Sequence, residues 1–198
     1  MKHLPFVALV LTLGLAHQAA HAHGYVSKPE SRGYQCKLGN NADCGAIQSQ
    51  PEALYAPSGW PALGPSDGHI ASADHTEFSP LDEQTKSRWF KRKMKAGVNK
   101  FTWTLTANHV TKNWRYYITK QDWNASKPLT RASFEDKPFC SIDDGSNPPP
   151  LEVTHTCTVP SRTGYQVILA VWERRDDSSS FYNVLDVKFP KKSVMSED

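Results

Sequence analysis

The chain has 198 residues, and its 23 Lys and Arg nearly balance its 20 Asp and Glu, which gives a formal net charge of +3. Charged residues are well mixed along the sequence, which argues against the basic stripe of a nucleic-acid-binding protein and against a polybasic membrane-binding patch. We interpret the short basic runs at 91–93 and 191–192 as solvated surface. We therefore expect neither nucleic acid nor a membrane among the partners of this protein.

Residues 1–22 have the pattern of a secretory signal peptide. A short basic start precedes an apolar run at 4–16 that is too short to span a bilayer comfortably, and Ala20-His21-Ala22 matches the A-x-A cleavage pattern. The alternative, a membrane anchor or a buried helix, fits this short run less well. We expect cleavage after Ala22 and a secreted protein whose first residue is His23.

The remaining sequence suits one domain with a sizeable core, which we place at 23–190, followed by a short polar tail at 191–198. From about Ser27 to Ser87 the chain is rich in Gly, Pro, Ser and Asn, which predicts a long loop insertion with short helices at most. Alternating or β-branched strand patterns follow at 101–107, 114–119, 165–172 and 181–189. Short strands between turns predict an all-β antiparallel β-sandwich that carries this insertion.

The four cysteines all lie in the part of the chain that we expect to be exported. An even number of cysteines in an oxidising compartment indicates disulfides. Three pairings are possible, and the two local bridges, Cys36–Cys44 and Cys140–Cys157, would pin one loop near each end of the domain. A zinc site is the competing interpretation, but the sequence contains no C-x-x-C spacing.

A histidine at the mature N-terminus has unusual metal-binding chemistry. The free α-amine and ring Nδ1 of His23 can chelate one metal ion from a single residue, and a second imidazole would complete a set of three nitrogens that suits Cu(II). His109 is the best second ligand because it directly follows the strand that ends at Ala107. We interpret the other histidines of the mature chain as structural or solvent-exposed: His69, His75 and His155.

Several motifs together carry a family resemblance. The mature start, His23-Gly24-Tyr25-Val26 followed by Pro29, Ser31-Arg32 and Tyr34-Gln35-Cys36, resembles that of the bacterial chitin-binding lytic polysaccharide monooxygenases, auxiliary activity family ten, with a chitin-binding type-4 domain. The likeness continues in order through 64–74, 101–109, 114–120, 128–134, 138–140, 164–172 and 181–187. It therefore covers essentially the whole mature chain.

The resemblance implies a fibronectin- or immunoglobulin-like β-sandwich with a flat, exposed site for one copper ion. His23 and His109 match the two histidine ligands of the family, and Phe181 matches an aromatic residue that limits access at one axial position. Ala107 matches the small residue that shapes the other axial side, and Trp172 matches a buried aromatic near the site. The expected catalytic residues are therefore His23, His109, Phe181 and Ala107.

The resemblance also implies the reaction. Family members cleave a polysaccharide oxidatively, using an external electron donor and O2 or H2O2, and here we expect a monomer that attacks crystalline chitin at C1. Glycoside hydrolysis would need two carboxylates flanking the bond, and no such pair stands out. Two other functions remain open: a non-catalytic chitin-binding adhesin or colonisation factor, and a copper carrier, although carriers tend to be richer in methionine than this chain.

The sequence departs from the family on the expected substrate face. Ser49 stands where an exposed Tyr is frequent, Gln50 where a Glu is frequent, and Tyr55 where an acidic residue near the copper is common. Tyr55 would either stack on a sugar ring or pack as an ordinary core residue. We assign substrate contacts to Tyr55, Gln50, Thr106, Asp176, which matches a polar family position, and Ser179, which replaces an amide.

Overall fold

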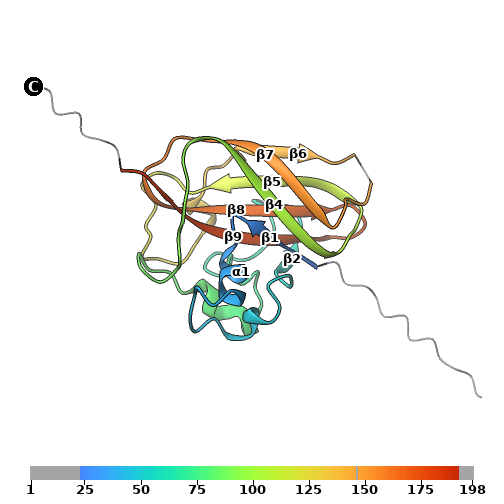
Figure 1. Cartoon of the computed structure of the whole chain (residues 1–198). Coiled ribbons are helices and arrows are strands. Elements are labelled where there is room, and N and C mark those ends of the chain that lie inside the picture. Colours follow the sequence, from blue (N-terminus) through green and yellow to red (C-terminus); the bar gives the residue numbers. More distant parts are fainter. Residues whose placement is uncertain (1–22, 146, 192–198) are drawn as a thin grey trace, which may run out of the picture.

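Two facing β-sheets form the body of the computed structural model, which describes residues 23–145 and 147–191. One sheet has three antiparallel strands in the order β1 (His23–Lys28), β4 (Gly97–Ala107) and β7 (Glu152–Val159). The other has the order β2 (Tyr55–Pro57), β9 (Ser179–Phe189), β8 (Gly164–Arg174), β5 (Thr111–Ile118) and β6 (Cys140–Asp143), and β3 (Arg92–Lys93) also pairs with β9. The predicted all-β sandwich is confirmed (Figure 1).

The four strand segments predicted from the sequence correspond to β4, β5, β8 and β9. The sequence patterns did not reveal β1, β2, β3, β6 and β7, most of which are short or rich in polar residues. β3 also departs from the antiparallel expectation, because its two residues pair with β9 in parallel. The expected signal peptide at 1–22 and all but the first residue of the expected tail at 191–198 lie outside the described residues.

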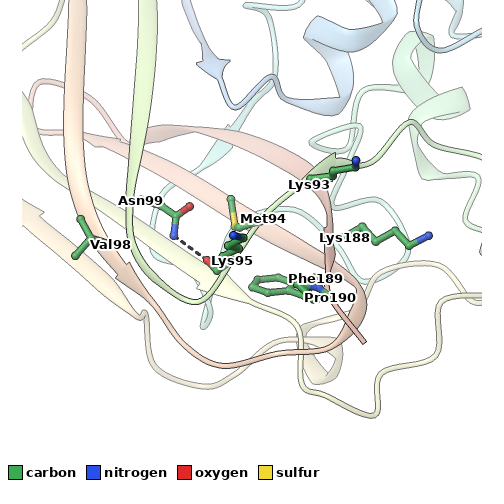
Figure 2. A pocket seen from close by; sticks show the side chains of 8 residues that line it. All are labelled: Lys93, Met94, Lys95, Val98, Asn99, Lys188, Phe189 and Pro190. Carbon is green, nitrogen blue, oxygen red and sulfur yellow. Dashed lines mark hydrogen bonds between the residues drawn. The ribbon is translucent and has the colours of Figure 1, made fainter. Parts of the chain in front are cut away.

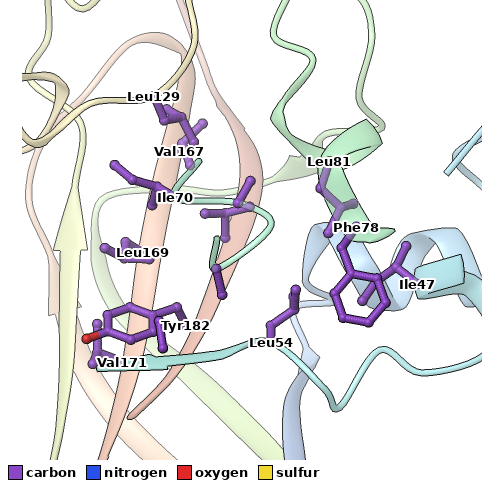
Figure 3. Close-up of a cluster of buried hydrophobic side chains, with 14 of the residues drawn as sticks. Ile47, Leu54, Ile70, Phe78, Leu81, Leu129, Val167, Leu169, Val171 and Tyr182 are labelled. Atoms are coloured by element: carbon purple, nitrogen blue, oxygen red, sulfur yellow. The ribbon is translucent and has the colours of Figure 1, made fainter. Parts of the chain in front are cut away.

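The central strands of the six-stranded sheet, β8 and β9, are buried on both faces. One face of β8 packs against the three-stranded sheet through Ile168, Ala170 and Trp172, and the other face packs against the insertion through Val167, Leu169 and Val171. Figure 3 shows Val167, Leu169 and Val171 facing apolar side chains of the insertion, among them Ile70 and Leu54. This two-sided burial explains why β8 is a continuous apolar run rather than an alternating one.

The insertion lies on one side of the sandwich and contains short helices, as the sequence predicted (Figure 1). Its helical turns are α1 (Arg32–Lys37), η1 (Gly45–Gln48) and η2 (Thr76–Asp82). Ser31 caps α1 by accepting a hydrogen bond from the backbone N–H of Tyr34 at 3.4 Å. The insertion also supplies β2, which the sequence did not predict, and it thereby extends the larger sheet.

Both local disulfides are present. Cys36–Cys44 ties the end of α1 to the start of η1 within the insertion. Cys140–Cys157 joins β6 of the larger sheet to β7 of the smaller one and so links the two layers covalently. In the described ranges, no helix has the length and apolar character that crossing a membrane requires.

A buried ion pair attaches the insertion to the larger sheet. The guanidinium of Arg32 on α1 donates from Nε and Nη2 to the two carboxylate oxygens of Asp186 on β9, at 2.9 and 2.7 Å. Both side chains are 1% exposed. Arg32 also donates to the backbone oxygen of Leu81 and to the Gln84 side chain, and Tyr165 donates its hydroxyl hydrogen to Asp186. These bonds satisfy the buried charges, which would otherwise be costly.

Candidate metal centre

His23 is held at one end of the small sheet by its pairing with β4. Its Cα partner is Ala107, the last residue of β4, and a register irregularity follows between His23 and Gly24. The hydroxyl of Thr106 donates to the His23 carbonyl at 3.3 Å, and the N–H of Gly24 donates to the Glu52 carbonyl at 3.2 Å. The backbone around His23 is therefore fixed by β4 on one side and by the insertion on the other.

His109 lies in the turn between β4 and β5, two residues beyond the Cα partner of His23. Two residues of chain span at most about 7 Å, so the pairing brings both histidines to the same end of the sandwich. The Nδ1 atom of His109 is 2.5 Å from Oδ2 of Asp176, which belongs to the turn between β8 and β9. The sequence predicted His109 as a ligand but placed Asp176 among the substrate contacts.

Aromatic rings form the base beneath this end of the sandwich. Phe181 is 1% exposed, and its ring centroid is 6.3 Å from that of His23. The Phe181 ring stacks on Trp172 at 5.1 Å, and Trp172 stacks on Trp114 at 5.0 Å. The indole N–H of Trp172 donates to the Thr111 hydroxyl at 2.9 Å, which satisfies its one buried polar group. Phe181 is thus a rigid apolar neighbour of His23.

Tyr55 lies beside Phe181 through the pairing of β2 with β9. Tyr55 is 42% exposed. Its ring centroid is 6.2 Å from that of Phe181 and 4.7 Å from that of His75. His75 donates from Nε2 to the Tyr55 carbonyl across 2.8 Å, and its Nδ1 is 3.4 Å from a carboxylate oxygen of Glu77. His75 therefore holds Tyr55 in place, a role that nothing in the sequence signalled.

A small cavity of about 190 Å³ adjoins His23 on the side of the insertion. Tyr55 and Gln50, both predicted substrate contacts, line it together with Ala53, His75, Glu77 and Phe78. Position 55, where the family commonly has an acidic residue, is Tyr in this chain. A carboxylate nevertheless lines the cavity, because Glu77 reaches it from η2. The structure therefore gathers His23, Tyr55 and Gln50 around one space.

The other residues singled out from the sequence do not line this cavity. Thr106 is exposed and bonded to His23, as described above. Ser179 is half-buried: its N–H and hydroxyl both bond to Asp177, at 2.6 and 2.9 Å, and Arg174 donates to its hydroxyl. His155 is buried and its ring is hydrogen-bonded to Tyr116. His69 is exposed and its ring is hydrogen-bonded to Asp82. Neither contact involves His23 or His109.

The donor set at this end of the sandwich fits copper better than zinc. Within residues 23–145 and 147–191, no three His, Cys, Asp or Glu side chains are grouped so that they could hold a metal ion. A set of two imidazoles and one α-amine needs no third side chain, because His23 supplies two nitrogens once it is the first residue. Nitrogen ligands suit Cu(II), which also binds most strongly in the divalent series.

Two larger grooves lie at the other end of the strands. One, of about 590 Å³, is lined by Lys93, Met94, Lys95, Val98, Asn99, Lys188, Phe189 and Pro190 (Figure 2). The second, of about 580 Å³, shares Lys95, Phe189 and Pro190 with it. Phe181 and Phe189 lie eight residues apart on β9, so the rise of the strand places these grooves about 26 Å from the ring beside His23. They belong to a different surface from the two histidines.

One family model matches nearly all of the chain that the structure describes. The family model described as "Lytic polysaccharide mono-oxygenase, cellulose-degrading" matches residues 23–187. This match covers most of the chain, so the chain belongs to that family.

Curated relatives at high identity carry one name. GlcNAc-binding protein A of Shewanella oneidensis is 56% identical over 198 residues, which cover 98% of this chain and 42% of that protein. GlcNAc-binding protein A of Vibrio vulnificus (strain CMCP6) is 52% identical over 191 residues, which cover 91% of this chain and 39% of that protein. The chain therefore spans about two-fifths of the length of these relatives.

Solved structures of the family share the whole domain. An AA10 LPMO from Photorhabdus luminescens has a TM-score of 0.83 and 42% identity, and the likeness covers 86% of this chain and all of that chain (100%). Bacillus amyloliquefaciens CBM33, solved in complex with Cu(I), has a TM-score of 0.79 and 39% identity over 84% of this chain and 99% of that one. The family and this copper complex support dependence on copper.

Proposed function

We propose that this chain is a secreted, copper-dependent lytic polysaccharide monooxygenase that binds crystalline chitin and cleaves its glycosidic bonds by oxidation at C1. The observation that carries the proposal is the pairing of His23 with Ala107, which brings a potential N-terminal chelate beside the turn that holds His109. The proposed ligands are the α-amine and imidazole of His23 and the imidazole of His109, which together hold one ion.

Copper bound there supplies one-electron redox chemistry toward O2 or H2O2, with electrons from an external donor. The protein contributes position and access. Phe181 puts a rigid apolar ring 6.3 Å from the ring of His23, and Ala107, the Cα partner of His23, leaves room there because its side chain is a single methyl group. Exposed Thr106 and Tyr55 lie beside this centre, so a flat crystal face can approach it.

Chitin is favoured over cellulose as the substrate. The relatives named GlcNAc-binding protein A support a polymer of N-acetylglucosamine, whereas the family description names cellulose. Incubation of the copper-loaded protein with ascorbate and either β-chitin or cellulose, followed by mass spectrometry of soluble products, decides the matter. We expect aldonic-acid oligosaccharides from chitin and none from His109→Ala, which still folds because His109 lies in a surface turn.

A non-catalytic chitin-binding adhesin is the second candidate, and the names of the relatives favour it equally. The same experiment separates the two functions. A copper-loaded, correctly processed chain that binds β-chitin but releases no oxidised oligosaccharides would be an adhesin rather than an enzyme. Loss of binding as well as oxidation would exclude both functions.

The proposed ligand set depends on cleavage after Ala22, because an amide nitrogen at His23 would not chelate in the same way. Export of the full chain and mass measurement of the product should show His23 as the first residue. A matched chain that retains Ala22 should bind Cu(II) far more weakly by calorimetry. Equal affinity of the two chains would exclude the α-amine as a ligand.

A further inference from the structure

The carboxylate of Asp176 makes a close contact with one ring nitrogen of His109. The distance from Oδ2 to Nδ1 is 2.5 Å, which is shorter than the range of about 2.7–2.9 Å that is usual for a charge-assisted hydrogen bond from nitrogen to oxygen. An ionised carboxylate can only accept a hydrogen bond, so Nδ1 is the nitrogen that carries the hydrogen. A neutral imidazole with hydrogen on Nδ1 presents its lone pair on Nε2.

The surroundings of Asp176 fix its position relative to His109. The N–H of Arg175 donates to the Val110 carbonyl at 2.9 Å, which ties the β8–β9 turn to the β4–β5 turn next to His109. Arg174, two residues before Asp176, is 8% exposed, bonds to Asp177 and lies 5.7 Å from the Phe181 ring centroid. The contact is therefore part of a connected turn rather than an isolated surface pair.

The charge of Arg174 also acts on this carboxylate. Burial lowers the pKa of the Arg174 guanidinium, and the nearby charge of Asp176 opposes that lowering. Asp176 thus interacts electrostatically with a cationic side chain and also contacts the imidazole of His109. A residue whose carboxylate is oriented in this way toward His109 is placed less well for direct contact with a polysaccharide.

We propose that Asp176 is a positioning residue that orients His109 and keeps its hydrogen on Nδ1, so that Nε2 is the nitrogen offered to copper. This inference rests on the proposed function, and it changes the role of Asp176 from a substrate contact to a partner of a ligand. Carboxylates that accept from the non-ligating nitrogen of a histidine commonly orient the ring, and their removal typically weakens metal affinity 10- to 100-fold.

Three variants of the processed chain test the role of Asp176. Asp176→Ala removes the acceptor, Asp176→Asn keeps an oxygen acceptor of the same shape without the charge, and Asp177→Asn disturbs the same turn without touching His109. We expect Cu(II) affinity, measured by calorimetry, to fall about 10- to 100-fold in Asp176→Ala and less in Asp176→Asn. Asp177→Asn should stay near the parent value.

A second readout needs neither copper nor turnover. In the metal-free protein, ring 15N NMR at a pH where imidazoles are neutral should assign the hydrogen of His109 to Nδ1, and Asp176→Ala should shift it toward Nε2. Unchanged tautomer and copper affinity in both Asp176 variants would overturn the proposal, as would a loss confined to chitin binding by the metal-free chain. These readouts keep their meaning if no oxidised products are found, so failure of the proposed function is distinguishable.

Discussion

Gly24 lies so close to Leu105 that a side chain at position 24 would have to displace its neighbours. A Cβ atom added there would be 2.6 Å from Cδ2 of Leu105 and 3.1 Å from the Trp172 ring. Leu105 and Trp172 are 3% and 0% exposed, so neither can move into solvent. The missing side chain therefore lets β1 approach the core directly after His23.

Gly24→Ala should destabilise the fold and displace His23 together. Overpacking of this kind costs about 1–3 kcal/mol, so we expect a lower thermal midpoint and weaker Cu(II) binding by the processed chain. Gly39→Ala is a suitable control because nothing lies within 4 Å of its added Cβ, and only its positive φ is unfavourable. Equal copper affinity in Gly24→Ala and Gly39→Ala would show that the close approach does not position His23.

Replacing Arg32 and Asp186 together should lower the free energy of unfolding by less than the two single replacements added together. Arg32→Met leaves the Asp186 carboxylate buried without its cation, and such a loss costs about 3–5 kcal/mol. The double variant Arg32→Met with Asp186→Leu removes both charges and should be more stable than the sum of the single changes predicts. Urea unfolding of the four proteins measures the coupling energy, and additive effects would contradict it.

Patterns in the sequence predicted the strands whose order of apolar and polar residues matches which of their faces are buried. The uninterrupted apolar run of β8 and the alternation in β4 both follow from which faces are covered. β2 could not be found in this way, because its three residues include a proline and form a strand through pairing with β9. Its existence depends on the fold of the insertion as a whole.

The sequence likewise predicted only part of the candidate site. His23 and His109 were found because N-terminal chemistry and a strand end are visible in the sequence. The contacts of His75 with Tyr55 and of Asp176 with His109 join residues 20 and 67 positions apart. Contacts of that kind arise when η2 packs near β2 and when two turns meet, and no local pattern signals either event.

His155 should make stability depend on pH. The residue is 7% exposed, and burial lowers its pKa from 6.5 to about 4, although the charge of Asp144 acts in the opposite direction. As the pH falls through 6.5 the unfolded chain binds a proton that folded His155 does not yet bind. Stability is therefore fully present above about 6.5, and by pH 4 the loss reaches on the order of 3 kcal/mol.

His155→Gln should flatten this part of the stability profile, because a glutamine oxygen can still accept the hydrogen that the Tyr116 hydroxyl donates to Nδ1 at 2.7 Å. The measurement is urea unfolding at pH 7.5 and pH 4.5. His69→Gln is the matched control for removal of a histidine, since the His69 side chain is 60% exposed. A wild-type slope in His155→Gln would assign the acid sensitivity to other groups.

Tyr55 and Phe90 offer a matched comparison for the proposed substrate face, because both residues are 42% exposed. Tyr55 adjoins Phe181 and the cavity beside His23, whereas Phe90 follows Trp89 just after the insertion, where its N–H donates to Asn41. A pair of aromatic side chains contributes about 0.5–1.5 kcal/mol, and we take the same scale for a sugar ring stacked on Tyr55, so Tyr55→Ala should weaken binding of the metal-free chain to β-chitin roughly 2- to 12-fold.

Depletion assays on β-chitin with both variants measure the difference. Phe90→Ala should bind like the parent chain, and the thermal midpoints of the two variants show whether either loss comes from unfolding. If Tyr55→Ala also binds like the parent, Tyr55 packs against His75 without contacting the polysaccharide. Its place beside Phe181 would then serve to shield the apolar base beneath His23, and the substrate face would have to lie toward Thr106.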